Sequence, residues 1–121
     1  MQSFQGKTAV LTGAGSGFGL ACAHRAAALG MNLVLIDVQA DALSAAAAAL
    51  SPTGVAVMTA VTDVADAAAM DRLADDVMER FGAPHLVFNN AGVGTSGLLW
   101  EATTAEWDWV MGVNVWGVIH G

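Results

Sequence analysis

The sequence predicts an α/β protein in which a parallel sheet of four strands, in the order 3-2-1-4, has helices on both faces. Short apolar runs alternate with helical patterns along the whole chain, which is typical of such sheets. The run over residues 32–37 is almost continuously apolar, as expected for a strand that is buried on both faces. The 121 residues fit one domain, over 1–121.

The first half of the chain predicts a strand, a glycine loop, a helix, a second strand and a second helix. We expect strands over residues 7–12 and 32–37. The helix between them covers 17–29 and ends at Gly30, because glycine is favoured just past a helix. The second helix, over 41–50, is rich in alanine and ends before a Ser-Pro pair.

The second half continues the alternation. A strand over 55–61 precedes a helix that Asp66 caps and that runs to Phe81, with apolar residues recurring every three or four positions. The fourth strand is centred on 86–88, and a loop rich in Gly, Ser and Asn follows over 89–97.

The last predicted element is a helix from Thr104 to the end of the chain. Thr103 and Glu106 have the spacing of a capping box at its start. Its apolar residues cover most of the circumference, which predicts a helix buried on all sides. The complete order β-α-β-α-β-α-β-α, with right-handed connections, makes the predicted fold Rossmann-like.

The composition limits the kinds of partner. The net charge is −7, and the only basic residues are Lys7, Arg25, Arg72 and Arg80, which argues against binding to nucleic acid. No apolar run approaches the ~20 residues of a membrane span, and the N-terminus lacks the layout of a secretory signal, so we expect a cytoplasmic protein. A single cysteine, Cys22, and three scattered histidines predict neither an internal disulfide nor a metal site.

The stretch Thr12-Gly13-Ala14-Gly15-Ser16-Gly17-Phe18-Gly19 is the predicted nucleotide-binding loop. Its spacing is T-G-x-x-x-G-x-G, which differs from the G-x-G-x-x-G of the usual dinucleotide fingerprint. Glycines let a ligand approach the backbone, and the first amides of the following helix favour a phosphate group. An ordinary glycine-rich turn is the alternative.

Polar residues follow the other three strands at the same edge of the sheet, where ligands bind in such folds. Asp37 can accept hydrogen bonds from adenosine ribose hydroxyls, or it simply caps the next turn. Asp63 can face an adenine amino group with Val64 packed near the ring, or it is a plain turn residue. The small residues of Asn89-Asn90-Ala91-Gly92 let the backbone lie close to a cofactor, although alone this is only a plausible turn.

Together with Asn114-Val115-x-Gly117, these motifs resemble the short-chain dehydrogenase/reductase family in order and spacing, over the whole chain. The resemblance implies a pyrophosphate site formed by Gly13, Ser16, Gly17, Phe18 and Gly19. It implies adenosine ribose contacts from Asp37 and Val38, adenine contacts from Asp63 and Val64, and contacts to the middle of the cofactor from Asn90, Ala91 and Gly92. It also implies that Asn114 is the active-site asparagine, which helps to hold a proton-relay water. A buried asparagine packed within a helix is the alternative for Asn114.

The chain departs from the family in what it lacks. The family's other catalytic residues, a Ser and a Tyr-x-x-x-Lys, would lie beyond Gly121, and this chain has no tyrosine and only one lysine. We therefore expect the cofactor-binding N-terminal half of a subunit about twice as long, without turnover by itself. The family also implies a homo-oligomer through the last helix, with Trp109 or Trp116 exposed when this chain stands alone.

Three functions remain in view. The first is an NAD(H)-dependent oxidoreductase acting between an alcohol and a ketone or aldehyde, and NAD is preferred because Ala14, Ser16 and Val38 stand where NADP sites carry a basic residue. The second is a non-catalytic nucleotide-binding or interaction module. The third, another Rossmann class such as a methyltransferase or a nucleotide-sugar enzyme, is disfavoured by the loop spacing together with the Asn-Asn-Ala-Gly motif.

Overall fold

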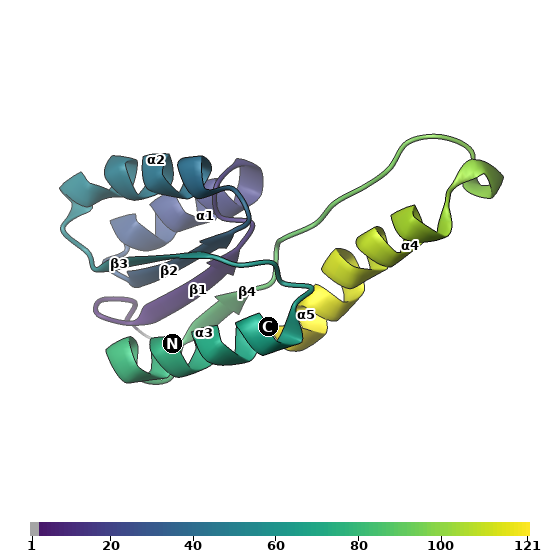
Figure 1. Ribbon diagram of the computed structural model, residues 1–121. Helices are drawn as coiled ribbons and strands as arrows, with labels where there is room; N and C mark the ends of the chain where they lie inside the picture. Colours follow the sequence, from purple (N-terminus) through teal and green to yellow (C-terminus); the bar gives the residue numbers. More distant parts are fainter. Residues whose placement is uncertain (1–2) are drawn as a thin grey trace.

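The computed structural model describes residues 3–121 and contains the predicted parallel sheet (Figure 1). Its strands are β1 (Thr8–Thr12), β2 (Asn32–Asp37), β3 (Val57–Val61) and β4 (Leu86–Phe88). All neighbours are parallel and the order is β3-β2-β1-β4, so the predicted order 3-2-1-4 is confirmed. The expected and observed strands differ by at most two residues at an end.

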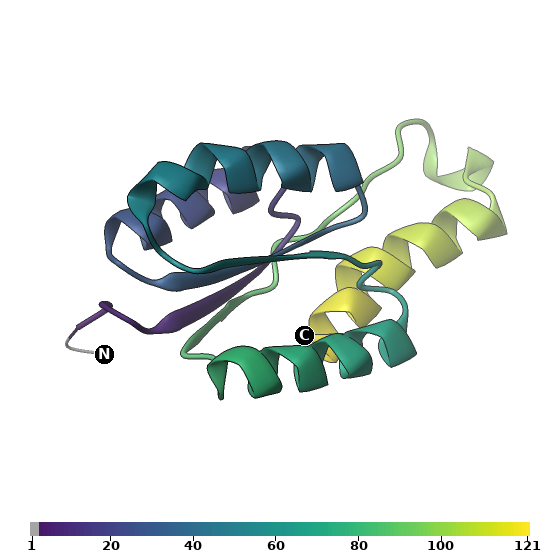
Figure 2. The ribbon, with the colours of Figure 1, turned by 60° about the vertical axis from the view of Figure 1, so that its left-hand side comes forward.

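Helices cover both faces of this sheet (Figures 1 and 2). Helices α1 (Gly17–Ala28) and α2 (Ala40–Leu50) lie on one face, and α3 (Ala67–Phe81) and the short α5 (Gly117–His120) lie on the other. Helix α4 (Thr104–Met111) projects beyond the sheet. Within residues 3–121, no helix combines the length and the apolar character that crossing a bilayer requires.

Each face of the sheet has its own apolar core, and β2 contributes to both. Leu33 and Leu35 pack under α1 and α2, whereas Val34 and Ile36 pack against α3, because successive strand residues point to opposite faces. All four side chains are at most 1% exposed. This two-sided burial is the physical reason for the continuously apolar run in the sequence, and truncating such a leucine to alanine costs about 2–5 kcal/mol.

The local signals for helix ends act as the sequence indicates. The Asp66 carboxylate accepts a hydrogen bond from the Ala69 amide at 3.0 Å and caps α3. Gly82 follows α3 with a φ of 72°, in the region that favours glycine. Both reciprocal bonds of the Thr103–Glu106 capping box are present at the start of α4. Short 3-10 turns, not predicted, extend α2 over Ser51–Thr53 and precede α4 over Leu99–Glu101.

The last helix is not the uniform α-helix that we expected. A π-helical turn over Gly112–Trp116 separates α4 from α5, and the Gly117 amide bonds the Gly112 carbonyl five residues back. Nor is it buried on all sides in this chain: Val113 is 8% exposed, but Trp109 and Trp116 are 50% and 54% exposed. The exposure of both tryptophans agrees with the expectation for this chain standing alone.

Candidate functional site

The motifs predicted to bind the cofactor surround one cleft at the carboxyl edge of the sheet. Thr12 pairs with Ile36 and Asp37 pairs with Val61, so β1, β2 and β3 end at a common edge. The cleft there has a volume of about 460 Å³. Of the residues predicted to bind the cofactor, those that line it are Gly13, Ser16, Gly17, Phe18, Asp37, Val38, Asp63, Val64, Asn90, Ala91 and Gly92. Gly19 is the one predicted cofactor residue that does not line the cleft.

The glycine loop is shaped by close backbone contacts. Gly13 and Gly17 have φ angles of 64° and 53°, which side chains rarely allow. A Cβ on Gly19 would collide with the Gly13 carbonyl and would lie 2.8 Å from Asn90 Nδ2. Gly19 therefore allows the loop to pack closely against Gly13 and Asn90, although it does not line the cleft itself. The Ser16 side chain does not cap α1, so the first amides of α1 are available to an anion.

The Asp37 carboxylate joins the end of β2 to the glycine loop. Its Oδ2 accepts a hydrogen bond from the Gly15 amide at 2.9 Å, and its Oδ1 accepts one from the Gln39 amide at 3.1 Å. Asp37 thus caps the following turn and also lines the cleft, so the two interpretations of this residue are compatible. A carboxylate has about four acceptor positions, which leaves capacity for a ligand's hydroxyl groups.

Asp63 and Val64 also combine a turn with a cleft wall. The Asp63 carbonyl accepts a bond from the Asp66 amide at 3.0 Å, and its carboxylate accepts one from the Ala65 amide at 2.9 Å. The Asp63 side chain is exposed, whereas Val64 is only 5% exposed. The turn presents an acid and an apolar side chain to the same cleft.

Thr12 fixes the loop after β4, a role that the sequence did not reveal. Its hydroxyl oxygen accepts hydrogen bonds from the Asn90 and Ala91 amides, both at 2.9 Å. The Asn90 side-chain amide in turn donates to the Thr12 carbonyl at 3.0 Å. Thr12 is only 2% exposed. The available signal was a hydroxyl residue at the end of a buried strand, directly before the glycine loop.

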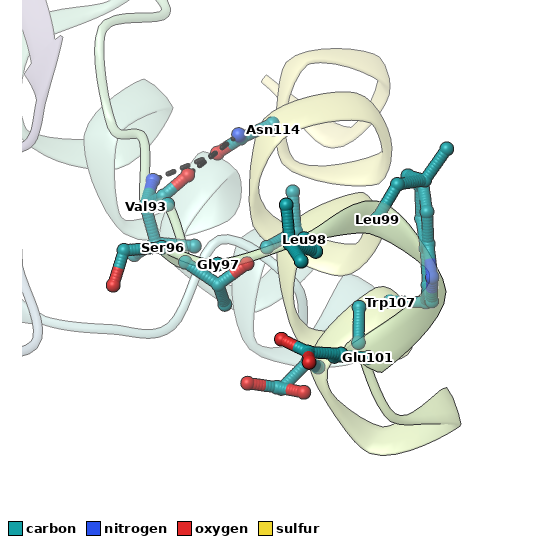
Figure 3. A pocket seen from close by; sticks show the side chains of 13 residues that line it. Val93, Ser96, Gly97, Leu98, Leu99, Glu101, Trp107 and Asn114 are labelled. Atoms are coloured by element: carbon teal, nitrogen blue, oxygen red, sulfur yellow. Dashed lines mark hydrogen bonds between the residues drawn. The ribbon is translucent and has the colours of Figure 1, made fainter.

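Asn114 lies outside this cleft, within the π-helical turn. Its Oδ1 accepts a bond from the Val93 amide and its Nδ2 donates to the Val93 carbonyl, both at 2.8 Å (Figure 3). Asn114 is exposed, so it is not the buried asparagine of the alternative interpretation. Both polar ends of the side chain bind the backbone after β4, which holds that loop against the helical segment. The role of Asn114 in holding a water stays a prediction.

A second cleft, of about 480 Å³, adjoins Asn114. The loop from Val93 to Leu99 lines this cleft together with Glu101, Glu106 and Trp107. Figure 3 shows the side chains around it. The Thr103 amide and hydroxyl, which donate hydrogen bonds to the Glu106 carboxylate, lower the pKa of Glu106 below its usual value. Among residues 3–121, no group of three or more His, Cys, Asp or Glu side chains is arranged to hold a metal ion.

The known proteins that this chain resembles include dehydrogenases and reductases. Residues 7–121 match the family model described as short chain dehydrogenase. The C alpha-dehydrogenase of Sphingobium sp. strain SYK-6 is 39% identical over 100% of this chain and 40% of that protein. A short chain dehydrogenase/reductase from Burkholderia phymatum, solved in complex with NAD, has a TM-score of 0.96 and 53% identity, covering 100% of this chain and 43% of that one. L-Sorbose reductase from Gluconobacter frateurii, complexed with NADPH and L-sorbose, has a TM-score of 0.92 and 34% identity, covering 98% and 45%.

The chain spans less than half the length of these relatives. The matched region nevertheless contains every motif described above, from the glycine loop through Asp37, Asp63 and Asn90 to Asn114. The family resemblance of the sequence is thus confirmed by the family model, by curated relatives and by solved structures: the chain belongs to the short-chain dehydrogenase family.

Proposed function

We propose that the protein containing this chain is an NAD(H)-dependent oxidoreductase that acts between an alcohol and a ketone or aldehyde. This chain supplies the half that binds the dinucleotide. The observation that carries the proposal is the single cleft at the carboxyl edge of the sheet, which gathers all the predicted cofactor residues except Gly19. Ligands bind at this edge in doubly wound sheets.

The chemistry of the cleft changes along its length in a way that suits a dinucleotide. The uncapped amides at the start of α1 suit the pyrophosphate, because they carry partial positive charge without adding a basic residue. Asp37 suits the adenosine ribose hydroxyls, and Val64 offers an apolar contact to adenine. Asn90 and its neighbours, held by Thr12, suit the middle of the molecule.

NAD is the proposed coenzyme, since Asp37 would face the extra phosphate of NADP. Two like charges about 4 Å apart repel by roughly 4 kcal/mol at intermediate dielectric. The places that can offset this charge hold no base: Ala14 is fully buried, Ser16 is neutral and Val38 is apolar and exposed. Of the two ligand-bound structural relatives named above, one carries NAD and the other NADPH, so membership of the family does not by itself decide the coenzyme.

The proposed catalytic step also needs a base that these 121 residues do not supply as a tyrosine, because they contain none. Bound NAD would supply the acceptor for a hydride from the carbinol carbon, and the protein would have to supply a base for the hydroxyl proton. The base expected from the family is the Tyr of a Tyr-x-x-x-Lys motif. Asn114 fixes the loop after β4 next to the second cleft, which is the proposed substrate side.

The test uses the full-length product of the gene that encodes this chain. Calorimetry should show binding of NADH, and a panel of secondary alcohols with NAD should yield NADH. Asp37→Ala should raise the ratio of NADP to NAD in kcat/KM by at least about tenfold, because it removes the repulsion. Asp71→Ala, which removes an exposed carboxylate from α3 outside the cleft, is the matched control and should leave the ratio unchanged.

Two results would contradict the proposal. A full-length protein that binds neither NADH nor NADPH would remove its basis. A protein that binds NADH tightly but turns over no alcohol, ketone or aldehyde would favour the second candidate, a non-catalytic nucleotide-binding module.

We also propose that the protein is a homo-oligomer that associates through the last helix. Trp116 and Ile119 expose 54% and 63% of their surface on the π-helical turn and α5, and exposed apolar and aromatic surface is typical of interfaces. Sedimentation should show full-length oligomers that Trp116→Glu dissociates. A full-length protein that sediments as a monomer at micromolar concentration would contradict this.

A further inference from the structure

The turn over residues 63–66 lines the part of the cleft that we propose binds adenine. Helix α5 contacts the same turn. Gly117 approaches so closely that a Cβ there would lie 2.5 Å from the Val64 side chain. One turn further along, His120 Nδ1 lies 2.7 Å from the Val64 carbonyl oxygen. Val64 thus lines the cleft, and both its side chain and its carbonyl group contact α5.

The contact from His120 is a directed hydrogen bond. A carbonyl oxygen only accepts, so Nδ1 must carry the proton, which fixes the tautomer of a neutral imidazole. The Trp116 ring stacks on the imidazole, with centroids 6.3 Å apart and an interplanar angle of 26°. The bonds that form the turn itself run from the Asp66 and Ala65 amides to Asp63, and they leave the Val64 carbonyl to His120.

We infer that His120 is a positioning residue for the adenine end of the dinucleotide site and acts through the Val64 backbone. This inference rests on the proposed function. Val64 is 5% exposed and lines the cleft, so a shift of its backbone moves the apolar wall that adenine would contact. The turn also aims the Asp63 carboxylate, which accepts from the Ala65 amide within it. His120 does not line the cleft, so it acts on coenzyme affinity without touching the coenzyme.

Two variants of nearly equal shape separate the hydrogen bond from packing. In His120→Asn, Nδ2 lies as many bonds from Cα as Nδ1 of histidine does, so the donor to the Val64 carbonyl is kept. In His120→Leu, a side chain of similar size has no donor. Both variants lose the stacking on Trp116, so any difference between them reports the hydrogen bond.

The experiment measures dissociation constants in the full-length protein for three probes: NADH, ADP-ribose and reduced nicotinamide mononucleotide. His120→Leu should bind NADH and ADP-ribose about fivefold more weakly, as expected for the loss of one hydrogen bond. The mononucleotide, which lacks adenosine, should bind as it does to the wild type. His120→Asn should stay within about twofold of the wild type for all three probes. At saturating NAD, kcat should be the same in all variants.

The outcomes separate this inference from the function on which it rests. A wild-type protein that binds neither NADH nor ADP-ribose would overturn the proposed function. Wild-type binding of both, together with equal binding by His120→Leu and His120→Asn, would overturn the inference alone. Equal weakening for the mononucleotide would also overturn it, because the effect would then be general to the fold. If His120→Leu does not fold, His120→Asp replaces it in the comparison with His120→Asn. Aspartate has the shape of asparagine, but its carboxylate repels the Val64 carbonyl oxygen instead of donating to it.

Discussion

Replacing Thr12 by valine should destabilise the protein far more than the change in shape suggests. Valine keeps the branched shape of threonine at a position that is only 2% exposed. It removes the oxygen that accepts hydrogen bonds from the Asn90 and Ala91 amides, both at 2.9 Å. Among residues 3–121, these two amides have no other acceptor, and their bonds to Thr12 join β1 to the loop after β4.

The magnitude follows from the two amides that lose their partner. A buried donor without an acceptor costs about 1–3 kcal/mol, so two cost about 2–6 kcal/mol. Asn90 and Ala91 are partly exposed, which lets water recover some of this loss, and we expect about 2–3 kcal/mol. Thr12→Ser keeps the oxygen and loses one buried methyl group, which costs about 1 kcal/mol.

The assay is urea denaturation of the full-length wild type, Thr12→Ser and Thr12→Val at one protein concentration, with NADH binding measured on the same samples. Thr12→Val should have the lowest midpoint and the weaker NADH binding, because Asn90 and Ala91 line the cleft. Equal midpoints for the two variants, or a lower midpoint for serine, would refute the reasoning from the hydrogen bonds.

Three further predictions concern other parts of the site. Gly19→Ala places a methyl group against the Gly13 carbonyl, and overpacking of about 1–3 kcal/mol should weaken NADH binding by about tenfold in calorimetry. The hydrogen bonds from Thr103 lower the pKa of Glu106 in the folded protein, so its carboxylate stabilises the fold above about pH 4.5. This stabilisation is lost as the pH falls through the lower folded-state pKa. Glu106→Gln should lack that pH dependence in thermal melts. Trp109 lines the cleft, so NADH should quench tryptophan fluorescence, and Trp109→Phe should remove much of that quenching.

Each of these predictions has a matched control. Gly94→Ala meets no atom within 4 Å and should bind NADH as the wild type does. Glu79→Gln changes an exposed carboxylate of α3 and should keep the pH dependence. Trp100→Phe changes a tryptophan that is 80% exposed and lies outside the cleft, so the quenching should persist. A control that behaves like its test variant would contradict the corresponding prediction.

Features of the fold that depend on neighbours in sequence could be predicted. The apolar run of β2, the Asp66 cap and the Thr103–Glu106 capping box each involve residues within a few positions, and the structure confirms all three. The strand order was predictable because parallel strands with right-handed connections leave few topologies. The common edge at which the motifs meet then follows from the topology.

Features that depend on distant partners could not be predicted. The Thr12 hydroxyl bonds amides 78 and 79 residues away, and nothing near Thr12 in the sequence indicates those partners. The π-helical turn has the same difficulty, since Asn114 reaches Val93, 21 residues earlier. His120 is an isolated histidine in the sequence, and only the fold brings it next to Val64, 56 residues earlier.

The position of β1 between β2 and β4 has a consequence for synthesis on the ribosome. The Thr8 amide, at the start of β1, bonds the ring of His85, 77 residues later in the chain. At about 5–20 residues per second, that stretch takes about 4–15 seconds to translate. Once β2 has been synthesised, β1 can pair with it on one side, while the groups that later pair with β4 remain free. The nascent chain therefore exposes an apolar strand edge for seconds, and codons or chaperones that shorten this exposure should raise the yield of folded protein.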